Sequence, residues 1–228
     1  MERARTDEYL RAINFLPGTT HSMRPFATMR ATQILGIFFL AALITFSDQA
    51  LAQDLHPSRR PSPIGIARTH IGDAYVKVTY GRPYRRGRAI FGANTDDQQF
   101  LVPFGQVWRT GANEATEITF TEDLLIDGNR VEAGTYAIFT EPGAETWTIH
   151  FSPHLGLDGT GRFDAETETF TQVFDPEEDV LTIRLPTGST DEEVDQFTIS
   201  FDHSSPKVAD LVLSWERTEV RIPFEAAP

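Results

Sequence analysis

Short runs in which apolar and polar residues alternate dominate this chain from Ile64 onward, and they constrain its fold more than any other feature. Tyr75–Tyr80 (YVKVTY) and Glu117–Thr121 (EITFT) place β-branched or aromatic residues at every second position. A period of two is that of a strand with one buried and one solvated face. No segment carries a sustained apolar period of 3.6 residues, so the sequence predicts an all-β fold.

Turn signals divide these runs at intervals of roughly ten residues. Asp127-Gly128-Asn129 stands between two apolar runs, which is a strong hairpin signal, and Glu141-Pro142-Gly143 marks a second turn. Further runs cover Thr135–Thr140, Thr146–Phe151, Thr169–Phe174, Val180–Leu185, Gln196–Phe201, Val208–Trp215 and Glu219–Phe224. About ten short strands predict a single antiparallel β-sandwich, jelly-roll-like or related, over residues 64–228. We expect the phenylalanines in these runs to fill its core: Phe120, Phe139, Phe151, Phe197 and Phe201.

The first 63 residues have a different composition. Ile34–Phe46 is an uncharged apolar run of 13 residues that follows Arg24 and Arg30 and precedes Ala50-Leu51-Ala52. A basic flank, a short apolar core and a small-x-small end are the parts of a secretory signal. We therefore expect residues 1–52 to be an upstream extension and signal peptide cleaved after about Ala52. Residues 53–63, rich in proline, are predicted to be a disordered linker.

The net charge and the absence of cysteine limit which binding partners and which cellular location we expect. The chain carries 33 acidic and 20 basic residues, a net charge of −13, and it has no cysteine. Binding of nucleic acid or of an anionic membrane needs the opposite sign of charge, so neither is expected as a partner. We expect a periplasmic or secreted protein with no stable membrane insertion after cleavage, whose stability rests on its core. The oligomeric state is left open.

The segment Leu101–Thr116 (LVPFGQVWRTGANEAT) holds most of the candidate site. Trp108 supplies a flat apolar wall, Arg109 a forked cation, Asn113 an amide and Glu114 a carboxylate. Gly111 and Asn113 tolerate positive φ, so the backbone can reverse tightly there. Arg82, Arg85, Arg86 and Arg88 form a basic cluster that is out of place in so acidic a chain, and Arg82 and Arg88 complete the candidate site.

Three functions are compatible with these residues. The first is a module that binds a small polar or anionic ligand, carbohydrates included, at Arg82, Arg88, Trp108, Arg109, Asn113 and Glu114. The second is a hydrolase or lyase with Glu114 as general base beside Arg109, although glycoside hydrolysis normally uses two carboxylates. The third is a structural envelope or interaction protein in which Trp108 plugs the sandwich and Arg109 pairs with Glu114.

No residue pattern predicts a cofactor or a metal. His150 and His154 have helical spacing in a segment predicted to be strand, which argues against a shared metal. The acidic loop at 156–168, with Asp158, Asp164, Glu166 and Glu168, leaves calcium open, but its spacing matches no EF-hand. There is also no serine nucleophile elbow.

The chain resembles a family of exported bacterial domains, domain of unknown function 2911. The resemblance rests on YGRP (80–83), GRAIFG (87–92), LVPFGQVWRTGANEAT (101–116), VEAGTYAIFTEPG (131–143) and the strands around Trp215, and it spans about residues 58–225. It implies export and a β-rich fold, and it brings no activity. Compared with the family pattern, Ala93–Phe100 is interpreted as an insertion between the GRAIFG and LVPFG segments.

Overall fold

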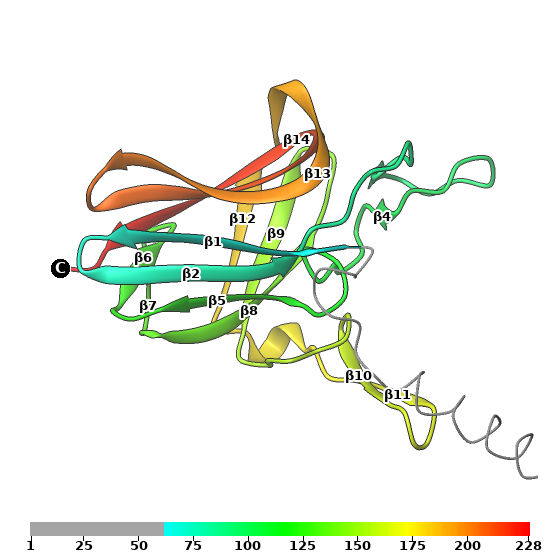
Figure 1. The fold of residues 1–228 in the computed structure, drawn as a ribbon, viewed down its shortest axis with the longest axis horizontal. Coiled ribbons are helices and arrows are strands. Elements are labelled where there is room, and N and C mark those ends of the chain that lie inside the picture. Colours follow the sequence, from blue (N-terminus) through cyan, green and yellow to red (C-terminus); the bar gives the residue numbers. More distant parts are fainter. Residues whose placement is uncertain (1–61) are drawn as a thin grey trace, which may run out of the picture. The chain divides into compact units, whose positions relative to one another are not determined.

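The computed structural model describes residues 62–228 (Figure 1). The predicted signal peptide and its cleavage after Ala52 lie outside this part, as does the linker up to residue 61. Within residues 62–228, no helix is long and apolar enough to cross a membrane.

The main element is a six-stranded antiparallel sheet in the order β1-β2-β5-β8-β9-β12. Each neighbour follows the last in chain order, so the sheet is a meander interrupted by excursions. Its strands are β1 (Ile64–Ile71), β2 (Ala74–Gly81), β5 (Thr116–Phe120), β8 (Gly134–Glu141), β9 (Thr146–Ser152) and β12 (Leu181–Pro186).

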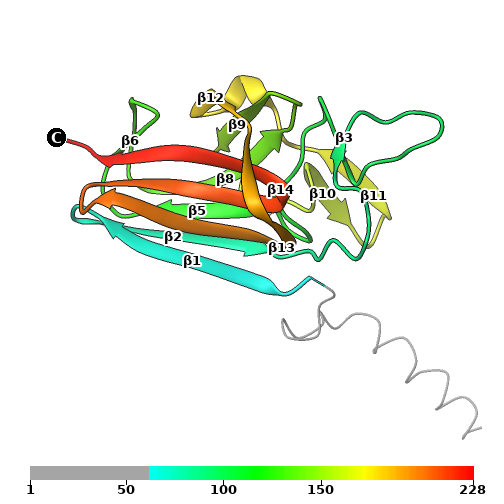
Figure 2. The same ribbon diagram turned by 90° about the horizontal axis from the view of Figure 1, so that it is seen from above.

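A second antiparallel sheet has the order β13-β14-β6-β7. It is formed by β6 (Leu124–Ile126), β7 (Asn129–Val131), β13 (Gly188–Ser205) and β14 (Val208–Ala226). Figure 2 shows β13 running between β14 and β1. The excursions carry a parallel pair, β3 (Phe91–Gly92) with β4 (Val102–Pro103), and a hairpin, β10 (Gly161–Asp164) with β11 (Thr169–Gln172). One short 3-10 turn, η2 (Pro176–Glu178), follows the hairpin.

The core lies between the two main sheets. Val76 and Ile118 of the first sheet and Leu211 and Ile222 of the second belong to one cluster of buried apolar side chains. A smaller cluster covers the other face of the six-stranded sheet, where Phe139 alternates with Ile138 along β8. Because the excursion at 155–180 lies over this face, β8 is buried on both sides.

The all-β prediction is confirmed, and so is the hairpin at Asp127–Gly128. Both turn residues have positive φ, 49° and 77°, as a two-residue type I′ turn requires. Phe120, Phe151 and Phe197 lie in the main core, and Phe201 packs against it half-buried. Phe139 lies in the smaller cluster on the other face of the sheet.

The prediction of about ten short strands is wrong at the C-terminal end, where β13 and β14 span 18 and 19 residues. The runs Val208–Trp215 and Glu219–Phe224, predicted as two strands, belong to the single strand β14. Glu216 takes a φ of 55° opposite Val194, between two shifts of register. This irregularity is a β-bulge, which disrupts the strand pairing locally. The strand itself continues through the polar residues that separate the two predicted runs.

Tyr80 joins the two sheets by side-chain hydrogen bonds. Its hydroxyl accepts from the backbone N–H of Ile199 at 2.9 Å and donates to the carbonyl of the same residue at 3.3 Å. Burial raises the pKa of Tyr80, so the hydroxyl stays protonated and able to donate.

We expect Tyr80→Phe to lower the free energy of unfolding by about 1–3 kcal/mol, because it leaves the buried N–H of Ile199 without an acceptor. The midpoint of urea denaturation measures this loss. Tyr75→Phe is the matched control, since the half-buried Tyr75 makes no hydroxyl hydrogen bond within residues 62–228, and it should stay within about 0.5 kcal/mol. Equal losses in the two variants would contradict a stabilising role for the hydrogen bonds of Tyr80 between the sheets.

Candidate functional site

Residues 108–116, called the 108–116 loop below, are attached to the interior strand β8 of the main sheet by backbone hydrogen bonds. Trp108 forms an antiparallel bridge with Thr140 of β8, with N–H···O distances of 2.7 and 2.9 Å. The N–H of Thr116 donates to the carbonyl of Arg109 at 3.1 Å, which closes the loop on itself. The sheet therefore fixes both ends of the segment that carries the candidate residues.

Trp108 is a buried anchor and offers no open face. The side chain is 8 % exposed, and its ring stacks on Trp215 with centroids 6.0 Å apart and an interplanar angle of 20°. Phe91 and Phe197 contact it edge-on, and its Nε1–H donates to the carbonyl of Gly111 at 3.0 Å. Neighbouring rings therefore occupy most of the ring surface on which a ligand could stack.

Two non-glycine residues of the loop have left-handed backbone conformations. Asn113 has a φ of 65°, as its residue type allows. Thr110 has a φ of 55°, which is rare for a β-branched residue and costs on the order of 1–3 kcal/mol. Thr110 is buried, and its carbonyl accepts from the Thr116 hydroxyl at 2.6 Å. The surrounding contacts thus hold a strained backbone beside Arg109.

The loop packs directly on the backbone of β2. A Cβ atom added to Gly81 would lie 1.9 Å from the carbonyl oxygen of Ala112, and one added to Gly111 would lie 2.9 Å from the carbonyl oxygen of Gly81. Glycine at both positions permits this approach. The contact sets the distance between the loop and the sheet end.

A cavity of about 220 Å³ opens beside the loop and is called the Arg109 cavity below. It brings together three of the six predicted site residues, Arg88, Trp108 and Arg109. Its other lining residues are Ser62, Pro83, Leu101, Val102, Gly111, Ala112 and Trp215. Both charged residues of the lining are arginines, and this lining contains no carboxylate.

Arg109 is half-buried and incompletely paired. Its Nε is buried with no hydrogen-bond partner in the described part of the chain. Burial lowers the pKa of Arg109 from its ordinary value, while the nearby carboxylates of Asp158 and Glu114 act to raise it. The guanidinium stays charged at neutral pH, and its Nε–H lacks the acceptor that a buried donor normally has.

The basic cluster at 82–88 divides into structural and cavity-lining residues. Arg85 forms ion pairs with Glu193 and, at 2.9 Å, with Glu216. Arg88 lines the cavity, and backbone carbonyls hold it: its Nε donates to Arg85 at 3.0 Å and its Nη2 to Tyr84 at 2.6 Å. Arg85 is therefore engaged in ion pairs within the fold, whereas Arg88 lines the cavity.

Arg82, Asn113 and Glu114 do not line this cavity. Arg82 donates to the carbonyl of Phe197 at 3.3 Å and to the hydroxyl of Thr198 at 3.1 Å, which joins β2 to β13. Asn113 donates to the carbonyl of Ser62 at 3.1 Å, so it fastens the chain just before β1. Both side chains act as structural links.

Glu114 is exposed and lines a different cavity of about 240 Å³. Glu117 lines the same cavity and accepts from the N–H of Gly156 at 2.9 Å. The loop thus separates an arginine-lined cavity from one that carries carboxylates.

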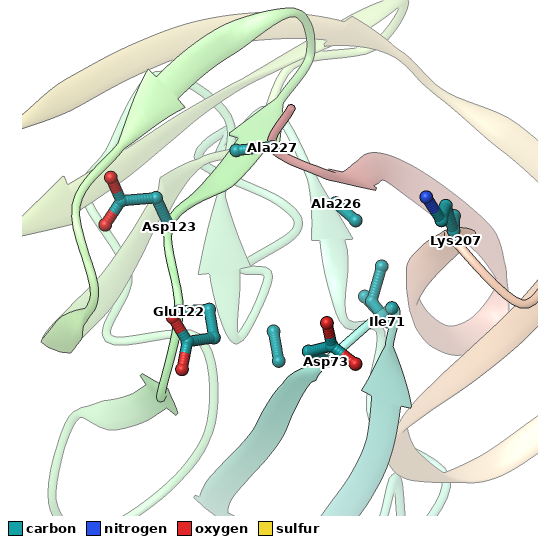
Figure 3. Close-up of a pocket in the computed structure, with 9 residues that line it drawn as sticks. Ile71, Asp73, Glu122, Asp123, Lys207, Ala226 and Ala227 are labelled. Carbon is teal, nitrogen blue, oxygen red and sulfur yellow. The ribbon is translucent and has the colours of Figure 1, made fainter.

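A further cavity, of about 340 Å³, lies at the opposite end of β2 (Figure 3). Asp73, Glu122 and Asp123 line it together with Lys207. Asp123 is already engaged, because it accepts from Arg130 at 2.7 Å and from the N–H of Ala133 at 2.9 Å. This end of the sandwich has the acidic character of the chain as a whole, in contrast to the Arg109 cavity.

In the acidic loop at 156–168, the Asp164 side chain is engaged by the loop's own backbone. Asp164 accepts from the backbone N–H groups of Thr167 and Glu166, which lower its pKa. Asp158 forms a backbone bridge with Glu114. Among residues 62–228, no group of three histidine, cysteine or acidic side chains is arranged to hold a metal ion.

A buried pair that the sequence analysis missed lies under the excursion at 155–180. Nδ1 of His150 is 2.7 Å from Oδ2 of Asp179, and Thr182 donates to the same oxygen at 3.1 Å. Nε2 of His150 and Oδ1 of Asp179 are buried without partners in the part of the chain described. Asp179 is 29 residues from His150, so no local spacing indicates the pair.

Gly81→Ala should displace the 108–116 loop, because its Cβ would overlap a backbone oxygen that no rotamer change can move. We expect a loss of about 3 kcal/mol or more in the free energy of unfolding, measured by urea denaturation. Gly188→Ala is the matched control, since its Cβ would meet only Glu219 at an ordinary 3.5 Å. A tolerated Gly81→Ala would contradict the close approach.

Replacement of one partner of the His150–Asp179 pair should be more harmful than replacement of both. His150→Leu and Asp179→Leu each leave a buried polar group, at a cost on the order of 3 kcal/mol. The double variant leaves neither group, so its loss in a urea titration should be well below the sum of the two single losses. Additive losses would show that the two side chains do not depend on each other.

Comparison with known proteins gives a family and no activity. Neither a curated protein nor a solved structure matches the chain. The family described as protein of unknown function (DUF2911) matches residues 62–224, which include the 108–116 loop and every residue that lines the Arg109 cavity. The chain therefore belongs to the DUF2911 family.

Proposed function

We propose that this protein is a binding module for a small anion, held in the Arg109 cavity. One observation carries the proposal: in a chain with 33 acidic and 20 basic residues, the only charged side chains of this lining are Arg88 and Arg109. A concave site with a few converging donors in an apolar wall is the usual form of a small-molecule site. Arg109, a residue of this lining, also has an Nε–H without an acceptor in the described part of the chain.

The geometry supports an anion better than a carbohydrate. Sugar binding by an aromatic residue uses an open ring face, and both Trp108 and Trp215 are buried among other rings. No comparable observation supports the alternative of a hydrolase or lyase. Glu114, its general base, lines another cavity from Arg109, so the two groups do not share one concave site.

Anions at matched ionic strength test the proposal on the full chain. Acetate, phosphate and sulfate are compared with chloride, and a bound anion raises the thermal midpoint because it stabilises only the folded state. At a concentration of 100 Kd the gain is about 2.7 kcal/mol, which is about 5 °C or more for a domain of this size. At least one anion should give such a shift.

Arg109→Gln should abolish the shift and Arg88→Gln should reduce it. Arg68→Gln is the control, since Arg68 is exposed on β1 and makes no hydrogen bond or ion pair within residues 62–228. The shift is read relative to each variant in chloride, so a change in basal stability does not disturb the comparison. Shifts of equal size in all three variants, or no shift in the parent protein, would refute the anion site.

A further inference from the structure

We propose that the ligand of the Arg109 cavity is a small monocarboxylate with a short apolar body, an inference that rests on the anion site proposed above. The size of the cavity is the first step. A volume of about 220 Å³ is below the range of about 300–1,000 Å³ that is typical of sites for drug-sized ligands. The occupant is therefore a metabolite fragment of a few non-hydrogen atoms, smaller than a nucleotide or a disaccharide.

The charge balance is the second step. Arg88 and Arg109 bring two positive charges, but Asp158 and Glu114 stand close enough to Arg109 to act on its pKa from outside the cavity. Because these carboxylates offset part of that positive charge, a monoanion matches the lining better than a dianion does. A dianion such as a phosphate monoester would leave negative charge against apolar walls, which is costly to bury.

The donors are the third step. Two of the three guanidinium nitrogens of Arg88 already donate to backbone carbonyls, whereas Nε of Arg109 has no partner in the described structure. A planar carboxylate can accept from Nε and a neighbouring Nη of one arginine in a parallel, bidentate pair. Arg109 would receive the carboxylate, and the remaining nitrogen of Arg88 would add charge at the exposed side.

The walls are the last step. Pro83, Leu101 and Val102 line the cavity with the indoles of Trp108 and Trp215, and Ser62 brings the only side-chain hydroxyl. Such walls favour a hydrocarbon body over one covered with hydroxyl groups, because each unpaired hydroxyl would lose its water hydrogen bonds. Charge at one end and apolar contact along the rest describe a short aliphatic or aromatic acid.

Matched probes on the full chain test this specificity. Acetate, butyrate and benzoate are titrated by calorimetry beside their neutral amides, acetamide, butyramide and benzamide, and beside inorganic phosphate, phenyl phosphate and glucose. We expect butyrate or benzoate to bind at least tenfold more tightly than its amide, than acetate and than either phosphate. Glucose should not bind.

Arg109→Lys keeps the charge and removes the fork, so it should weaken binding of the best carboxylate at least tenfold. Arg184→Lys is the matched control, because Arg184 lies exposed on β12 and makes no hydrogen bond or ion pair within residues 62–228, and it should leave binding unchanged. Tighter binding of a phosphate than of every carboxylate would overturn the carboxylate inference and keep the anion site. Equal affinity for acid and amide, or full affinity in Arg109→Lys, would also overturn the inference. No binding of any anion would remove both proposals.

Discussion

The cluster of aromatic rings around Trp108 is the contact on which the rest of this molecule depends. Its members come from a short excursion strand, the 108–116 loop, β9, β13 and β14: Phe91, Trp108, Trp147, Phe197 and Trp215. Ring pairs of this kind add roughly 0.5–1.5 kcal/mol each beyond the area that they bury. Because both main sheets contribute, the cluster closes one end of the sandwich and fixes the loop that ends at β5. Arg109 follows directly after the anchoring ring, so the same contact that stabilises the fold also places the cation.

Charge is distributed unevenly over the fold. Carboxylates gather at the sheet end where Asp73 and Glu122 lie, while Arg85 and Arg221 are engaged in ion pairs. Exposed pairs of this kind contribute little to stability individually. Arg88 and Arg109 differ because they face a concave lining without a carboxylate. A net negative surface around such a cavity slows the approach of anions, so it favours small monoanions over highly charged ones.

The sequence predicted the strands better than the site, for physical reasons. Period-two patterning and the Asp127–Gly128 turn are local signals, and they were sufficient to predict the strands and the first hairpin. The bulge at Glu216 could not be predicted from the sequence, since polar residues that interrupt an apolar run give the same residue pattern at a bulge as at a turn. The structural hydrogen bonds of Arg82 and Asn113 could not be predicted for a related reason. Their partners, Phe197 and Ser62, are distant in sequence, and only tertiary contacts show that these donors are already used.

The strain at Thr110 explains why neighbours in the 108–116 loop serve different cavities. A left-handed residue reverses the backbone, and Asn113 reverses it again three residues later. Between the two reversals, the backbone of Gly111 and Ala112 lies in close contact with Gly81. This contact restricts the directions in which the side chains of the loop can point. Arg109 precedes the first reversal and Glu114 follows the second, and the two residues line different cavities. The short separation in sequence therefore suggests a catalytic pair, but the two residues line different cavities, and Glu114 acts on Arg109 only through its charge.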